Sequence, residues 1–148
     1  MSEVAPVHCW PVEANGQHRF ALGRIIDCSA AVLRAYANEQ LATNPGVGLW
    51  ECELDGDELT WSNEIYDMFG LPRDVTVTRA EALTYYSHHS REVMERLRAE
   101  AIKHKRSFVL DAEIWPRHGS RRCWMRVVAA PVCEHGEVVR LQGFKQIL

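Results

Sequence analysis

Few residues in this 148-residue chain have the types and spacing that catalysis needs. The sequence has no nucleophile on a G-x-S-x-G turn, no glycine-rich phosphate loop and no H-E-x-x-H zinc motif. Its clustered carboxylates should fall on turns or on solvated strand faces, where nothing would activate them. These carboxylates are Glu51, Glu53, Asp55, Asp57, Asp111 and Glu113. The sequence therefore predicts a protein that is not an enzyme.

The cysteines and turn histidines do not form a metal site. Five cysteines make an odd number and include no C-x-x-C pair, which favours reduced thiols in a cytoplasmic protein over a disulfide framework. Cys123 and Cys133 lack the close spacing of zinc ligands, and His118 and His135 lie in separate turns. We expect no metal site from these residues.

The composition of the chain limits the kinds of molecule that it can bind. The chain is 47% hydrophobic and 25% charged, as expected for one globular domain. Its net charge of -3 and its scattered basic residues argue against binding to nucleic acid or to a membrane surface. No apolar run approaches the roughly 20 residues that span a bilayer. We expect a cytoplasmic protein.

The first half of the chain predicts an amphipathic helix and a hairpin. Apolar residues recur at helical spacing over about residues 27–41, with Asp27 or Ser29 as the N-cap and the sequence Asn-Pro-Gly at 44–46 as the stop. Before this helix, a turn at 15–16 suggests a further hairpin. After it, residues 47–61 alternate as two strands around a turn at 55–57.

The second half predicts helices followed by strands. Two short helices are expected at 63–70 and 78–86, and a longer one from Ser90, its N-cap, to Lys105. Three strands, at 107–115, 122–132 and 137–146, then close the chain. The order of elements indicates an α+β fold with an antiparallel sheet.

The strand at 122–132 is apolar on both faces. Alternation puts Cys123, Met125, Val127 and Ala129 on one side and Trp124, Val128 and Ala130 on the other. The same alternation turns Trp115 and Phe144 toward the second, outer face. We expect the other helices on the inner face and the helix at 27–41 on the outer face.

Two motifs resemble those of a known family. The stretch "GVGLWECELDGDELTWSNEIYDMFGL" is similar to the opening "GxWExxLxxGxLxWSxExYxxFGL" of one branch of the PAS domains, and "HGSRRCWMRVVAAPVCEHGEVVRLQGFKQ" is similar to their closing "DGxxRWxxxxxxPVxxxxGxVxxLxGxxQ". The resemblance implies a five-stranded antiparallel sheet with helices on one face. It divides the chain into an N-terminal extension, residues 1–44, and a PAS domain, residues 45–148.

The resemblance also implies a ligand cavity between the sheet and the helices. The candidate lining residues are Trp61, Tyr66, Phe69, Tyr85, Met94, Leu97, Leu110 and Met125. We favour a filled interior without a cofactor, while a haem, a non-covalent flavin or a small metabolite stays open. Haem would need His88, His89 or His104 as its ligand. The photochemical flavin reaction needs a cysteine in the helix at 63–70, which has none.

For function, the resemblance implies sensing and signal transduction. With "QIL" in place of the family's "QDIT" ending, we expect a domain that regulates a partner, such as a histidine kinase, by contact. The apolar outer face beside the helix at 27–41 leads us to expect a homodimer. The candidate interface residues are Leu33, Tyr36, Ala37, Leu41, Trp115, Trp124, Val128 and Phe144. The alternatives are a sensor of haem, flavin or a metabolite, and the N-terminal sensory piece of a longer signalling enzyme.

Overall fold

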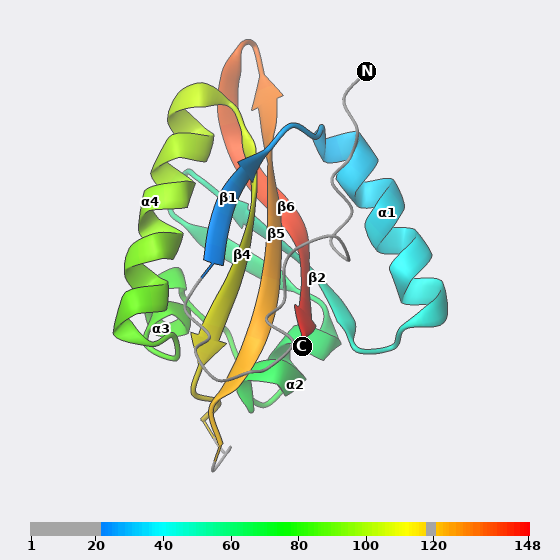
Figure 1. Ribbon diagram of the computed structural model, residues 1–148, viewed down its shortest axis with the longest axis vertical. Coiled ribbons are helices and arrows are strands. Elements are labelled where there is room, and N and C mark those ends of the chain that lie inside the picture. The colour runs from blue at the N-terminus through cyan, green and yellow to red at the C-terminus, as the bar shows by residue number, and fades with distance from the viewer. Residues whose placement is uncertain (1–21, 118–120) are drawn as a thin grey trace.

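The core of the protein is one antiparallel sheet of six strands (Figure 1). The computed structural model describes residues 22–117 and 121–148. The strands lie in the order β1-β4-β5-β6-β2-β3. Their bounds are β1 Leu22–Ile26, β2 Val47–Glu53, β3 Glu58–Trp61, β4 Ser107–Ile114, β5 Cys123–Glu134 and β6 Glu137–Ile147. The five strands predicted between residues 47 and 146 are confirmed.

Strand β1 is the element that the sequence did not predict. It pairs with β4, with Ile25 opposite Phe108, and so covers an edge that would otherwise leave backbone groups unpaired. Its sequence, "LGRII", is too short to show an alternating pattern. The hairpin expected around residues 15–16 lies outside the described residues.

Four helices accompany the sheet: α1 Ala30–Thr43, α2 Asn63–Phe69, α3 Arg79–Leu83 and α4 His88–His104. The N-cap predicted at Ser29 is confirmed, since its hydroxyl accepts the N–H of Val32. Thr78 caps α3 by accepting the N–H of Glu81, while α2 follows Ser62, whose side chain makes no cap hydrogen bond. Among the described residues, no helix combines the length and the apolar character needed to cross a membrane.

The predicted N-cap of α4 was wrong. Ser87, not Ser90, caps this helix, and its hydroxyl accepts the N–H of Ser90 at 3.2 Å. Ser90 lies inside the first turn, where its buried hydroxyl accepts the N–H of Glu113 at 2.8 Å. Ser90 therefore fastens α4 to β4 instead of starting the helix.

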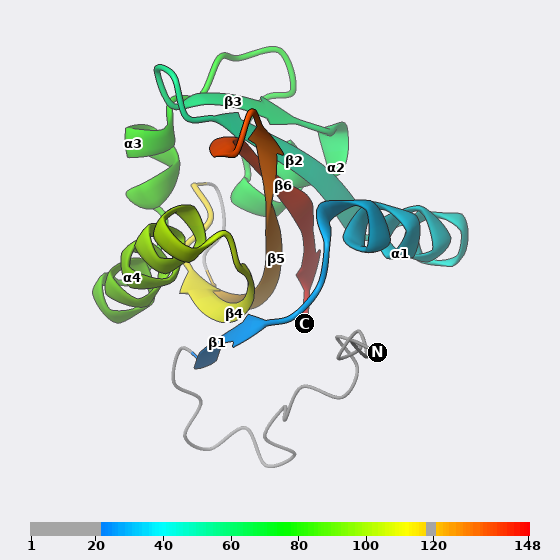
Figure 2. The same ribbon diagram turned by 90° about the horizontal axis from the view of Figure 1, so that it is seen from above.

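The sheet is buried on both faces, as the alternation of β5 predicted. Met125, Val127 and Ala129 belong to the inner core with α2, α3 and α4. Val128 and Ala130 belong to an outer core beneath α1. Figure 2 shows α1 on one side of the sheet and α4 on the other. The chain therefore covers its own outer face.

One carboxylate contradicts the sequence reading. Asp111 was expected to be solvated, yet it is 1% exposed on the outer face of β4. Arg126, opposite it on β5, donates to it from Nε at 2.7 Å and from a terminal nitrogen at 2.9 Å. A carboxylate is buried only when a partner such as Arg126 satisfies its charge. That partner lies on another strand, so the sequence around Asp111 gave no indication of its burial.

Candidate functional site

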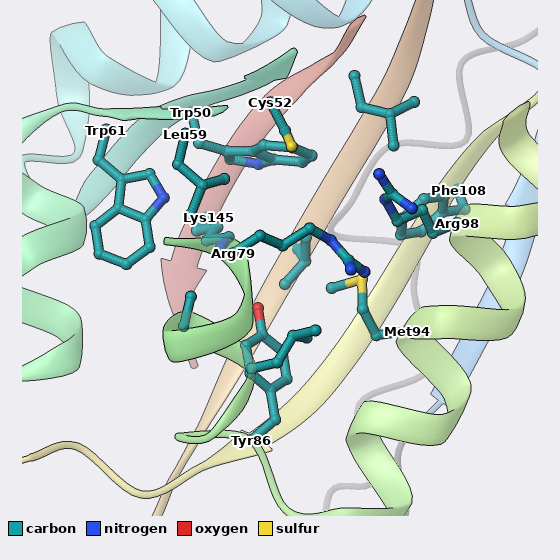
Figure 3. A pocket seen from close by; sticks show the side chains of 14 residues that line it. Trp50, Cys52, Leu59, Trp61, Arg79, Tyr86, Met94, Arg98, Phe108 and Lys145 are labelled. Atoms are coloured by element: carbon teal, nitrogen blue, oxygen red, sulfur yellow. The ribbon is translucent and has the colours of Figure 1, made fainter. Parts of the chain in front are cut away.

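A cavity of about 50 Å³ lies between the inner face of the sheet and helices α3 and α4 (Figure 3). Strands β2, β3 and β6 supply one wall. The lining residues are Trp50, Cys52, Leu59, Trp61, Arg79, Ala82, Leu83, Tyr86, Met94, Arg98, Phe108, Val127, Leu141 and Lys145. Most of these side chains are apolar, while two arginines and one lysine supply the charge.

Lys145 is the unusual residue of this cavity. Its side chain starts from the inner face of β6 and is only 6% exposed. Its Nζ lies 5.2 to 5.9 Å from the ring centroids of Phe69, Trp50, Trp61 and Tyr86. Burial of the ammonium lowers the pKa of Lys145 to about 7, and the negative charge of an ionised Cys52 would oppose this shift. The ring faces offset part of the cost of desolvating the charge.

Lys145 has no carboxylate or hydrogen-bond acceptor in residues 22–117 and 121–148. The indole nitrogens of Trp50 and Trp61 are also buried without an acceptor in this part of the chain. The Trp61 ring is held in place by stacking on Phe69, with centroids 5.1 Å apart and planes 8° from parallel. The lining of the cavity thus includes three residues whose polar donors have no acceptor among the described residues.

The two arginines of the lining are already paired. Arg79 of α3 forms an ion pair with Glu95 of α4, and Arg98 of α4 binds Asp57 at 2.7 Å. Neither carboxylate lines the cavity, and no other acidic residue among those described does so. The described lining of the cavity therefore has cationic side chains and no acidic one.

Burial perturbs two further groups of the lining. Desolvation raises the pKa of the Cys52 thiol, which keeps it protonated and unreactive near neutral pH. Desolvation also raises the pKa of Tyr86, whose hydroxyl points into the cavity in Figure 3. Both groups are neutral at physiological pH.

A surface groove borders the cavity. This groove has a volume of about 480 Å³ and runs between the β2–β3 turn and α3. It shares Leu59, Arg79 and Leu83 with the cavity lining. The groove and the cavity therefore adjoin between β3 and α3.

The structure places the predicted lining residues in one core but not all at the cavity. Trp61 and Met94 line it. Phe69, Leu97, Leu110 and Met125 are buried in the surrounding core, and Tyr66 and Tyr85 pack at its margin. Contact of any of these eight residues with a ligand stays a prediction.

Sequence reasoning missed the charged residues of the cavity. Lys145, Arg79 and Arg98 were not singled out, nor were Trp50 and Tyr86. One signal was present, because the alternation that turns Phe144 outward must turn Lys145 inward. The arginines gave no signal, since a helix that is charged on one side usually exposes that side.

The histidines considered as haem ligands do not fit that role. His88 and His104 are exposed and lie beside Glu92 and Glu100, at 2.6 and 3.6 Å. His89 is exposed as well, and none of the three lines the cavity. A cavity of about 150 Å³ holds one benzene, so the present volume of about 50 Å³ is too small for a porphyrin or a flavin ring. Among the described residues, no cluster of metal-binding side chains occurs.

The candidate interface residues surround the contact between α1 and the sheet. Leu33, Ala37, Val128 and Phe144 are buried there, and Tyr36 and Leu41 are partly buried against them. Trp115 follows the end of β4 and is 52% exposed, while Trp124 is half-buried. A role for these residues between two copies of the chain stays a prediction, and four of them are already buried within one copy.

Strand β6 contributes side chains both to the inner cavity and to the outer face that packs against α1. Lys145 points into the cavity, and its neighbour Phe144 points to the outer face, where its ring centroid lies 5.7 Å from that of Tyr36 in α1. Strand β2 repeats the arrangement with Trp50 inside and Leu49 outside. A displacement of either strand therefore reaches both faces of the sheet.

Several solved sensor domains are similar to this structure. No protein-family model and no curated protein matches the chain. The N-terminal domain of a diguanylate cyclase with a PAS/PAC sensor from Marinobacter aquaeolei has a TM-score of 0.62 and 18% identity, covering 68% of this chain and 94% of its own. A domain of a putative light and redox sensing histidine kinase from Haloarcula marismortui has a TM-score of 0.62 and 18% identity, covering 76% and 98%. A sensory box histidine kinase/response regulator from Burkholderia thailandensis has a TM-score of 0.63 and 16% identity, covering 75% and 84%.

Proposed function

Since the chain has the PAS fold, we propose that it is a sensory domain that transmits a change in its inner cavity to helix α1 on the opposite face of the sheet. The observation that carries this proposal is the pair of adjacent residues Phe144 and Lys145. One contacts α1 through Tyr36, and the other lines the cavity. The similar sensor domains of a cyclase and of two histidine kinases support a signalling role.

Helix α1 is the element best suited to respond. It packs on the sheet through apolar contacts and forms an exposed ion pair, Arg34 with Glu51 at 3.3 Å. Apolar contacts are non-directional, so a packed helix can slide between two arrangements at small cost. An event in the cavity selects one arrangement only if it has a different affinity for each of them.

The signal would leave the domain by contact and not by catalysis. We propose that a cytoplasmic partner, such as a histidine kinase, or a second copy of the chain reads the exposed side of α1. This side carries Val32, which is 42% exposed. Light scattering should show a dimer at high protein concentration and a monomer for Val32→Glu. A wild-type monomer at every concentration would remove the homodimer from the proposal.

Hydrogen exchange tests the transmission itself without a ligand. Lys145→Met changes the cavity while keeping a side chain of similar length. Exchange of the α1 backbone amides should change by about threefold or more. Lys103→Met, which alters an exposed lysine on α4, is the matched control and should leave α1 unchanged. Identical exchange of α1 in the wild type and Lys145→Met would overturn the proposal.

A further inference from the structure

We infer that the inner cavity binds a small monocarboxylate, with the ammonium of Lys145 and the indole N–H groups of Trp50 and Trp61 as hydrogen-bond donors. This inference rests on the proposed function, because it names the class of molecule that the sensory cavity would detect. It gives one role to three polar groups that have no other partner in the described residues.

The first argument is the number of unsatisfied donors. Lys145 is 6% exposed, and Trp50 and Trp61 are each 8% exposed. Buried polar groups in folded proteins almost always have a partner, and each one left without it destabilises the fold. A carboxylate offers two oxygens that accept several hydrogen bonds, so a single ligand has enough acceptor capacity for all three donors.

The second argument is charge. The cavity has three cationic side chains and, within the described residues, no acidic one in its lining. Arg79 and Arg98 are occupied by Glu95 and Asp57, so they contribute to the field without being free to bind. Only Lys145 lacks a counter-ion. A water molecule could satisfy an indole N–H, but an anion would also stabilise the protonated form of Lys145.

The third argument is size and polarity. A cavity of about 50 Å³ has room for a ligand of roughly three to five non-hydrogen atoms. The walls away from Lys145 are apolar and include Leu59, Met94, Phe108 and Leu141. Such walls suit a short alkyl group, while a doubly charged phosphate or sulfate would lose its hydration against them. Formate, acetate and propionate match both the volume and the walls.

The test uses the fluorescence of the tryptophans that line the cavity. The full chain is titrated with sodium formate, acetate or propionate at constant ionic strength, and in parallel with sodium phosphate. Even at the highest ligand efficiency, a ligand of this size has a dissociation constant no lower than a few micromolar. We expect saturation between about 0.1 and 10 mM. Acetamide and propionamide, which match the shape but lack the charge, should bind at least about tenfold more weakly.

Two variants and a control test the donors. Lys145→Met should weaken carboxylate binding about tenfold or more, as expected for the loss of one charged hydrogen bond. Trp61→Phe keeps the aromatic ring but removes its N–H and should weaken binding severalfold, so the inference stays testable if the lysine variant fails to fold. The control Lys103→Met should bind as the wild type does.

Four outcomes would overturn the inference: no saturable binding of any carboxylate, equal binding of acetamide and acetate, tighter binding of phosphate, or undiminished binding to both Lys145→Met and Trp61→Phe. The two proposals can fail separately. If α1 responds to Lys145→Met but no carboxylate binds, the ligand class is wrong and the sensory coupling stands. If carboxylates bind but exchange in α1 never changes, the site stands and the sensory coupling fails.

Discussion

Replacing Lys145 with methionine is expected to remove a particular dependence of stability on pH. Burial lowers the pKa of this lysine from 10.5 to about 7 in the folded protein, while the unfolded chain keeps an ordinary value. Between these two values the unfolded chain binds more protons at Lys145 than the folded protein does, so the free energy of unfolding rises with pH. A tenfold change in an equilibrium constant corresponds to about 1.4 kcal/mol, so the rise from about pH 7 to pH 9 is about 2 kcal/mol.

The assay is urea unfolding of the wild type and Lys145→Met at several pH values in a buffer without carboxylates. The difference between the two proteins isolates Lys145, because groups that titrate alike in both cancel. The charged or titratable groups that face it are Cys52, Arg79, Tyr86 and Arg98. Of these, the Cys52 thiol titrates nearest to the range used, and burial raises its pKa further, away from that range. Below pH 9 the predicted difference therefore belongs to the lysine.

Equal pH dependence in the two proteins would refute this reasoning. It would mean that Lys145 stays charged when the protein folds, either in contact with solvent or beside an acceptor that the described residues do not supply. A difference of opposite sign, with the wild type losing stability relative to the variant as the pH rises, would show that the folded state favours the ammonium.

Three substitutions test how the two faces of the sheet are built. Leu33→Ala, on the buried side of α1 at a position 2% exposed, should lower the free energy of unfolding by about 2 to 4 kcal/mol in urea. Val32→Ala on the exposed side should change it by less than about 0.5 kcal/mol. Equal effects of the two substitutions would place α1 off the sheet. Asp111→Asn should cost about 3 kcal/mol or more because it leaves a buried arginine charge without its carboxylate, and a cost near zero would show that Arg126 has an equivalent partner. Gly143→Ala would bring a methyl group to 1.7 Å from a backbone carbonyl oxygen of β5. We therefore expect the free energy of unfolding to fall by about 3 kcal/mol, or the protein not to fold. Wild-type stability in thermal denaturation would contradict the register of β5 and β6.

Strong periodic patterns made most of the fold predictable. The two apolar faces of β5 correctly indicated helices on one side and α1 on the other. Strand β1 escaped prediction because five residues at a sheet edge need no apolar alternation. The cap at Ser87 escaped because two serines stand within one turn of each other, and only packing against β4 decides that Ser90 turns inward.

The candidate site was less predictable than the fold. Aromatic and methionine residues were expected at the cavity, and Trp61 and Met94 are there. Lysine side chains are rarely buried, so the residue type predicts a solvated Lys145 even though the strand alternation places it on the inner face. The burial of Asp111 was equally hard to predict, because it depends on Arg126, which lies opposite it on the adjacent strand β5. Charge inside a protein is set by tertiary partners that local sequence does not reveal.

The most direct test of coupling through the sheet is fluorine NMR of protein containing 3-fluorotyrosine. The chain has four tyrosines, of which Tyr86 lines the cavity and Tyr36 lies on the outer face beside Phe144. Each resonance can be assigned by a tyrosine-to-phenylalanine variant. If the cavity and α1 are coupled, Lys145→Met shifts the resonances of both Tyr86 and Tyr36, while Lys103→Met shifts neither. A Tyr36 resonance that stays fixed while that of Tyr86 moves would show that the outer face does not sense the cavity.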